Sequence, residues 1–394
     1  MIQKAIFAFC TCLVSNFVFS QTTDVETILQ KIEHNNVELK GFDNYIEGNK
    51  NALKNTNVLP NQEISGYYLP YGNSLIGKYS EIQISQSFEF PTVYSVRSEL
   101  ISRQRAQLQY AYEQKRQQIL LQSKKAILEV IALNKIDIVQ QQRLSNAKTL
   151  FEHNQILFDK GEIGILELNK AKVAYLNLQF KLEHNKLDRQ TSLNVLQNLN
   201  GGDSIDITQT DYESTFMLPN EDSIWQEKII LSPTIQFHIQ SENVSYQQVN
   251  LAKAKALPDL TVGYNYQGFT TDNVSGFYAG LSLPIWGNRL RSRAAQSNLS
   301  YSKSNTIVQV QTIKSDFKSL FYKYQSLLTM YNEYNTTLQV LNSEGLLLKA
   351  YQLGDISFSE YYVELEFYYS ALDALLDMEK QLHLIKVQLL AHQL

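Results

Sequence analysis

Residues 92–158 form a run of 67 positions that contains neither proline nor glycine. The run is rich in Gln, Lys, Leu, Ala and Arg, which all favour the α-helix. As a single helix it would extend about 100 Å at about 1.5 Å per residue. A globular domain of ordinary size has no room for such a helix, so the chain is expected to be elongated.

Mostly apolar side chains within and after this run, with one asparagine among them, are spaced alternately three and four residues apart. They are Leu144, Ala147, Phe151, Asn154 and Phe158, and then Leu168, Ala171, Tyr175, Leu178 and Leu182. This spacing is typical of a coiled coil. The glycine-containing stretch FDKGEIGILEL lies between the two sets and predicts a tight turn. We therefore expect two long helices that pack against each other as a hairpin, because helices of this length do not suit an ordinary globular bundle.

The chain also contains an internal repeat. VLPNQEISGYY at 58–68 resembles ALPDLTVGYNY at 256–266, and FDKGEIGILEL resembles YQLGDISFSEY, which contains Gly354. Pro91 and Pro284 each follow a strand-like segment, and each lies 70 residues before the glycine of its turn. Each unit is therefore predicted to contain a helix, two strands, a very long helix, a tight turn and a further helix.

The repeat predicts the domain organisation. The first unit covers 21–200, with a strand hairpin at 61–90 and a helical turn near 158–165. A polar connector follows at 201–223. The second unit covers 224–394, with a strand hairpin at 259–285 and a turn near 351–358; its long helix is expected from about Arg289 to Gln352.

Four strands of about ten residues are predicted at 61–70, 79–90, 259–269 and 276–285. In SEIQISQSFEFP, at 80–91, apolar residues alternate with polar ones from Glu81 to Phe90, and Gln86 is a polar residue that falls on the apolar side. Such alternation describes either a sheet on a soluble core or a strand that crosses a bilayer. Aromatic residues at the strand ends and the helices' length favour the bilayer.

A four-stranded sheet is too small to cross a membrane alone. Backbone groups in lipid must all be hydrogen-bonded, so an open sheet edge is excluded there. Known membrane barrels begin at about eight strands. Several copies of the chain must therefore contribute, and three copies would supply twelve strands.

The first twenty residues, MIQKAIFAFCTCLVSNFVFS, have the pattern of a secretory signal peptide with cleavage after Ser20. An uncleaved anchor is the alternative. Cys10 and Cys12 both lie in this segment, and neither follows the small and apolar residues that lipid attachment needs. The mature protein is therefore predicted to be exported, unlipidated and free of cysteine.

Several function classes lack support in the sequence. The 35 basic and 39 acidic residues give a net charge of −4 without a basic run, so no nucleic-acid partner is expected. The six histidines form no spacing typical of metal ligands, and phosphate-binding or nucleophile motifs are missing. We expect no metal, no cofactor and no enzymatic activity.

The duplicated motifs resemble the outer-membrane efflux family typified by TolC, over essentially the whole predicted mature chain. They are the pairs Leu59-Pro60 and Leu257-Pro258, the prolines Pro91 and Pro284, and the two glycine turns. The resemblance implies a mainly α-helical homotrimer with a twelve-stranded β-barrel in the outer membrane. It also implies a long coiled-coil α-barrel in the periplasm.

The resemblance further implies a function and partners. Such proteins are exit ducts of tripartite efflux or type I secretion systems, and they meet a periplasmic membrane-fusion adaptor and an inner-membrane pump of the RND or ABC type. The chain is short, like the family's heavy-metal branch, which makes metal cations the first expectation and drugs or polypeptides the alternatives. A periplasmic coiled-coil scaffold or adaptor is the alternative from another class.

Three groups of site residues follow from the resemblance. The turns with Gly161, Glu162, Gly354 and Asp355 would contact the adaptor. Glu167 and Glu360 would be pore-entrance carboxylates, or else only helix-capping residues. Positions 170 and 363 are Lys and Val, so a second carboxylate ring is incomplete. A lipid-facing aromatic girdle is predicted at Tyr71, Tyr79, Phe90, Phe269, Phe277 and Trp286.

Overall fold

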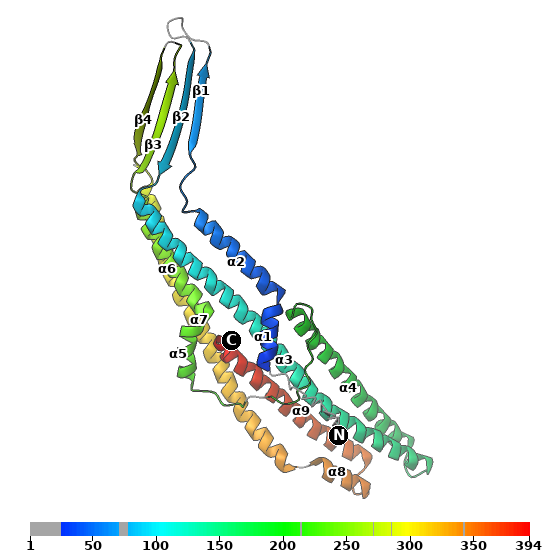
Figure 1. Cartoon of the computed structure of the whole chain (residues 1–394). Coiled ribbons are helices and arrows are strands. Elements are labelled where there is room, and N and C mark those ends of the chain that lie inside the picture. Colours follow the sequence, from blue (N-terminus) through cyan, green and yellow to red (C-terminus); the bar gives the residue numbers. More distant parts are fainter. Residues whose placement is uncertain (1–24, 71–77, 213–214, 271, 285, 342) are drawn as a thin grey trace, which may run out of the picture.

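The computed structural model describes residues 25–70, 78–212, 215–270, 272–284, 286–341 and 343–394. The predicted signal peptide and Tyr71 lie outside these ranges. Figure 1 shows an elongated molecule with a β-sheet at one end and helical hairpins at the other. Two long helices connect the ends, as the proline- and glycine-free run predicts.

The sheet consists of four antiparallel strands in the order β1-β2-β3-β4. They are β1 (Glu63–Leu69), β2 (Tyr79–Phe88), β3 (Asp259–Gly268) and β4 (Asn273–Ser282). The predicted mainly helical class with four strands is thus confirmed. β4 begins and ends three residues earlier than predicted, because its pairing with β3 runs from Gly268↔Asn273 to Asp259↔Ser282. Among the residues that the structure describes, no strand lies beside the outer edges of the sheet, on β1 and β4.

The helices of the two repeats correspond in order. The first repeat contains α1 (Val25–Asn35), α2 (Val37–Asn55), α3 (Pro91–Asp159) and α4 (Ile165–Leu199). The second contains α5 (Glu221–Leu231), α6 (Pro233–Ala254), α7 (Asn288–Leu341), α8 (Ser343–Gln352) and α9 (Phe358–Leu389), followed by the 3₁₀ turn η1 (Ala391–Gln393). The long helix that we predicted from Arg289 to Gln352 corresponds to α7 and α8, and residue 342 between them lies outside the described ranges.

Each repeat begins with two helices where the sequence suggested one. The Asn36 side chain separates α1 from α2, because its Oδ1 accepts from the Leu39 amide at 2.9 Å and caps α2. Its Nδ2 donates to the Leu199 carbonyl at 2.7 Å and ties this break to the end of α4. Ser232 and Pro233 separate α5 from α6 without a side-chain cap, since proline favours the first helical position.

The long helices each carry two shorter helices. α2 and α4 pack along α3, while α6 and α9 pack along α7, and α3 also contacts α6 and α9. In the half away from the sheet, the lateral order is therefore α4, α3, α9 and α7. α4 and α7 are the outer helices of this layer.

A polar connector crosses the middle of the molecule. The side-chain amide of Asn134 in α3 donates to the carbonyls of Ile207 and Gln209, at 2.9 and 2.8 Å. Ile207 is buried among Ile127 and Ile131 of the same helix. The predicted connector thus packs against one side of α3.

Because of His383 in α9, the stability of this connector depends on pH. Its ring stacks on Tyr212 and Phe216, with centroids 4.0 and 4.8 Å apart. Burial, with smaller contributions from Lys386 and Lys135, lowers the pKa of His383 to about 4. As the pH falls, the His383 side chain of the unfolded chain binds a proton at a higher pH than that of the folded chain. The contribution of His383 to the free energy of unfolding is therefore full above the ordinary pKa of about 6.5 and falls as the pH drops towards 4.

We expect this loss to be on the order of 2–3 kcal/mol between pH 6.5 and 4. His383→Phe keeps an aromatic ring in the stack and removes the titrating group, so the variant should lose less stability over that range. Chemical denaturation at several pH values measures the difference. Equal pH slopes for the two proteins would show that His383 does not cause the loss.

Candidate functional site

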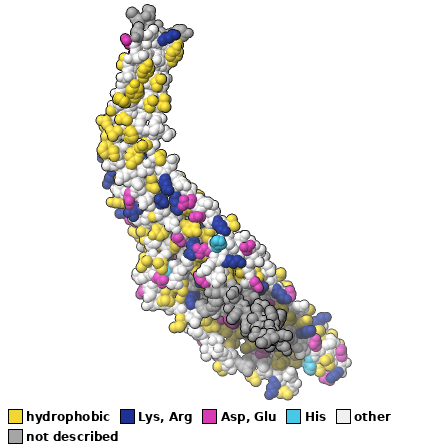
Figure 2. All heavy atoms as spheres, viewed as in Figure 1, with side chains coloured by type: hydrophobic (Ala, Val, Ile, Leu, Met, Phe, Trp, Pro, Cys, Tyr) yellow, Lys and Arg dark blue, Asp and Glu magenta, His cyan; other side chains and the backbone are white. Residues whose placement is uncertain are grey.

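The sheet has one apolar and one polar face. The register places Ile64, Ile84, Tyr264 and Phe277 side by side across all four strands. Directly paired residues share a face, so the alternation predicted for single strands continues over the whole sheet. Phe277 is 89% exposed and Ile64 72% exposed, although both are large apolar residues. Figure 2 shows these apolar side chains gathered at the sheet end, whereas charged side chains lie over the helices.

The opposite face is polar and hydrogen-bonded. The carboxylate of Glu81 accepts from the Tyr79 hydroxyl at 2.5 Å and from the Asn265 side-chain amide at 2.6 Å. The amide of Gln83 donates to the Tyr278 hydroxyl. The Tyr278 ring lies over Gly263, where a Cβ atom would be only 2.5 Å from the ring. A larger residue at 263 would therefore displace the Tyr278 ring from this position.

Gln86 is the exception on the apolar face, and the structure explains it. Its Nε2 donates to the carbonyls of Pro60 and Ser87, at 2.8 and 2.9 Å. The side-chain amide is thus hydrogen-bonded to nearby backbone.

The predicted girdle residues occupy three kinds of position. Phe90 caps the start of α3 and Trp286 lies near the end of β4, both at the helical end of the sheet, while Phe269 follows β3 at the other end. Two predictions need correction. Phe277 lies in the middle of β4, because this strand starts earlier than expected. Tyr79 shares the polar face with Glu81, since both have odd positions in β2.

A buried ion pair joins the sheet to the helices. Arg97 in α3 pairs with Glu89 just beyond β2, and Lys255 at the end of α6 lies 3.4 Å from the same carboxylate. Burial opposes ionisation of Glu89, but Arg97 and Lys255 outweigh it and lower its pKa. The carboxylate of Glu89, just beyond the sheet, is thus paired with two basic side chains.

The two helical turns share one backbone motif. Gly161 has a φ of 78° and Gly354 a φ of 80°. The amide of Glu162 donates to the Leu157 carbonyl at 2.9 Å, and the amide of Asp355 donates to the Ala350 carbonyl at 3.0 Å. These bonds form Schellman caps, which need a residue with positive φ. The predicted adaptor-contacting residues therefore form two equivalent tips, at the end of the molecule away from the sheet.

Gly161 and the nearby Gly164 allow a prediction with a matched control. Gly161→Ala should destabilise the first tip by about 1 kcal/mol, since L-residues disfavour positive φ. Gly164, three residues on, has a φ of −85° and caps α4 without a side chain. A Cβ at either glycine would meet no atom within 4 Å, so only backbone conformation distinguishes them.

Gly164→Ala is the control and should cost little, while Gly164→Ser should stabilise the turn by adding a cap. Amide hydrogen exchange at the first turn of α4 measures each effect. Equal exchange in Gly161→Ala and Gly164→Ala would contradict the positive-φ argument.

Glu167 and Glu360 occupy the same position, the third of their helices. Glu360 folds back in a capping box, where its carboxylate accepts from the amide and hydroxyl of Ser357 at 2.8 and 2.9 Å. These bonds, the backbone one first, lower the pKa of Glu360. Gly164 gives Glu167 no such side-chain partner. The capping role thus applies to Glu360, whereas the pore-lining role of both residues stays a prediction.

A polar network between the two helical hairpins was not predicted. Arg143 in α3 is only 3% exposed and pairs with Asp373 in α9 at 2.7 Å. Its guanidinium lies 4.1 Å from the centre of the Tyr369 ring. Tyr369 and Asn146 both donate to Glu344 in α8, at 2.9 Å. In the sequence, Arg143 is one of many polar residues in the predicted long helix. No local pattern therefore identifies it as buried.

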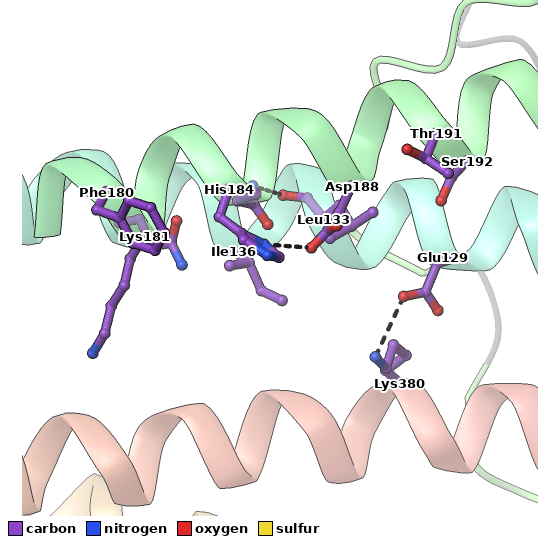
Figure 3. Close-up of a pocket in the computed structure, with 12 residues that line it drawn as sticks. Glu129, Leu133, Ile136, Phe180, Lys181, His184, Asp188, Thr191, Ser192 and Lys380 are labelled. Carbon is purple, nitrogen blue, oxygen red and sulfur yellow. Dashed lines mark hydrogen bonds and ion pairs between the residues drawn. The ribbon is translucent and has the colours of Figure 1, made fainter. Parts of the chain in front are cut away.

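A groove of about 550 Å³ lies where α3, α4 and α9 meet. In Figure 3, Glu129 and Lys380 bridge α3 and α9 across it at 3.4 Å, while His184 and Asp188 of α4 pair at 3.0 Å. Its floor contains Leu133 and is open and mostly polar. No group of three potential metal ligands occurs within the described residues.

The outer helices of the layer keep apolar side chains on their free sides. In α4 these are Leu166, Val173, Phe180 and Leu187, seven residues apart and all exposed. In α7 they are Tyr301, Val308 and Tyr322, also at multiples of seven. An apolar residue at every seventh position is typical of a helix with a coiled-coil partner. Among the described residues, α4 packs mainly against α3 and makes a smaller contact with α9.

No helix in the described ranges is both long and apolar enough to span a membrane. Residues 78–202 match the family model described as outer membrane efflux protein. A search of curated proteins gave no match.

Solved structures with the same fold cover most of the chain. The structure of CusC has 15% identity and a TM-score of 0.78, over 94% of this chain and 92% of that one. The CmeC outer membrane channel of Campylobacter jejuni has 14% identity and a TM-score of 0.74, over 93% and 85%. The outer membrane protein VceC of Vibrio cholerae has 13% identity and a TM-score of 0.76, over 93% and 96%.

The family match covers α3 and α4, and the fold shared with the solved channels extends over most of the chain.

Proposed function

We propose that this chain is an outer membrane efflux protein whose helices extend into the periplasm, and that three copies of it close into one exit duct. The observation that carries the proposal is the pair of free sheet edges, on β1 and β4 at opposite sides of a sheet with an exposed apolar face. An unpaired edge in lipid would leave backbone groups without partners. Joining β1 of one copy to β4 of the next removes every edge, and three copies give a barrel of twelve strands.

The helical end supports the same arrangement. The free apolar sides of α4 and α7 lie at the two margins of the helical layer, so neighbouring copies can bring them together. Both the sheet and the helices would then close around one axis. The polar face with Glu81 and Gln83 would line the water-filled side, and the face with Ile64 and Phe277 would meet lipid.

We propose that the duct belongs to a tripartite efflux system. The tips with Gly161, Glu162, Gly354 and Asp355 lie farthest from the membrane sheet, which suits contact with a periplasmic adaptor. An inner-membrane pump, of the RND type first and the ABC type second, would supply the substrate. Glu167 and Glu360 next to the tips would place carboxylates near the periplasmic opening.

The short chain leads us to propose heavy-metal cations as the first substrate class, with drugs or a type I secreted polypeptide as alternatives. A periplasmic adaptor or scaffold is the competing class. The exposed apolar face of the sheet argues against it, because a protein surrounded by water gains nothing from a large apolar surface of this kind.

Deletion of the gene, with complementation by the intact chain, tests this function. We expect the deletion strain to lose tolerance to divalent or monovalent metal ions and to regain it on complementation. Unchanged metal tolerance together with increased sensitivity to drugs would remove the metal assignment and keep the duct. Recovery of the mature protein in the soluble periplasmic fraction would contradict the duct itself.

A further inference from the structure

All acidic residues of the four strands lie on the polar face. They are Glu63 in β1, Glu81 in β2 and Asp259 in β3. Glu63 pairs with Ser85, Glu81 with Gln267, and Asp259 with Ser282, which are all residues of that face. The four strands contain no lysine, arginine or histidine. The polar face therefore carries negative charge without a basic residue in the strands.

The three carboxylates lie at three different heights. Glu63 is level with Ser85 of β2, which lies four residues from Glu81 along that strand. Ser85 is in turn level with Gly263 of β3, which lies four residues from Asp259. Each step is about 13 Å at about 3.3 Å per strand residue. The carboxylates thus form three tiers along the sheet, spaced more widely than a Debye length of about 8 Å.

No base neutralises these tiers. Among the described residues, none of the three carboxylates takes part in an ion pair, whereas Glu89 just below the sheet is paired with Arg97 and Lys255. Glu81 is also held in place by neutral donors, from Tyr79 and Asn265. Neutral donors fix the position of a carboxylate and leave its charge in place.

We propose that Glu63, Glu81 and Asp259 determine the charge preference of the barrel, so that it passes cations more readily than anions. This inference rests on the proposed trimeric duct, in which each residue occurs three times around the lumen. Walls of low dielectric constant focus the field of such rings into the water between them. The cation preference then resides in the membrane part of the duct, separate from any effect of Glu167 and Glu360 at the tips.

A single introduced cysteine can measure the local potential. Ser65 lies on the polar face between the tiers of Glu63 and Glu81, and it pairs with Gln83. Both native cysteines lie within the predicted signal peptide, so Ser65→Cys would be the one thiol of the mature protein. Intact cells are treated from outside with a cationic trimethylammonium or an anionic sulfonate methanethiosulfonate reagent. The tips do not affect this approach, so it works whether or not they are closed.

At low salt we expect the cationic reagent to react about tenfold faster than the anionic one, relative to their rates with a free thiol. The ratio should fall towards one at high salt. It should also fall in Glu63→Gln and Asp259→Asn, whose carboxylates have no hydrogen-bonded partner to disturb, and furthest when Glu81→Gln is added. Glu47→Gln in α2 removes the same charge outside the sheet and should leave the ratio unchanged.

A ratio near one in the starting protein, or an unchanged ratio in the triple variant, would overturn the proposed charge preference and leave the duct intact. Protection of Ser65→Cys from both reagents is a different result. It would mean that the polar face is not wet, and it would overturn the duct as well.

Discussion

Ile64→Lys should prevent assembly in the outer membrane, whereas Ser65→Lys, at the next residue of β1, should permit it. Ile64 is 72% exposed on the apolar face, next to Ile84, and Ser65 lies on the polar face next to Gln83. A lysine on the lipid side of a barrel costs about 2–4 kcal/mol near the bilayer centre. The cost recurs in every copy of the assembly, while a lysine on the wet side keeps its hydration.

Heat-modifiable migration of outer-membrane fractions, with antibody detection, measures the outcome. We expect the Ser65→Lys protein to reach the level of the unmodified protein and the Ile64→Lys protein to be degraded or to remain in the periplasm. Equal levels of the two variants would show that the faces of the sheet are not divided between lipid and water.

Phe180→Lys should abolish the assembly and leave the single chain folded. Phe180 is 71% exposed in the middle of the stripe on α4, and its ring lies 6.3 Å from that of His184 in the same helix, so its replacement should cost little within the single chain. In a closed ring, the lysine would place its charge in an apolar contact between copies, where burial of an unpaired charge is strongly unfavourable. Gln179→Lys introduces the same charge one residue earlier, on an exposed side away from the stripe, and serves as the control.

The oligomeric state of both variants can be compared in detergent by light scattering, and folding by circular dichroism. We expect a helical monomer for Phe180→Lys and an unchanged oligomer for Gln179→Lys. A stable oligomer of Phe180→Lys would show that this stripe does not lie between copies.

Local sequence patterns predicted the elements that depend on neighbouring residues. The twofold period located the strands, since each places alternate side chains on opposite faces. The two tips were predicted from glycines that the structure places at positive φ, where a Schellman cap requires them. The long helix predicted from Arg289 to Gln352 corresponds to α7 up to Leu341 and α8 from Ser343, with residue 342 outside the described ranges.

Features that join distant parts of the chain were not predicted. The burial of Arg143 depends on Asp373 and Tyr369, which lie more than 200 residues away. The separate helix α1 depends on a bond between Asn36 and Leu199. The position of Tyr79 on the polar face was also missed, because aromatic residues at strand ends suggest a girdle irrespective of their parity. The strand register and the hydrogen bond from Tyr79 to Glu81 are what place Tyr79 on the polar face.

The mass of the intact assembly tests the central claim most directly. Protein extracted from the outer membrane in mild detergent can be measured by native mass spectrometry, without any substitution. Closure of the free edges of β1 and β4 by neighbouring copies predicts a species with three times the mass of the mature chain. A species with the mass of one chain would contradict the claim, because a single four-stranded sheet cannot form a closed barrel.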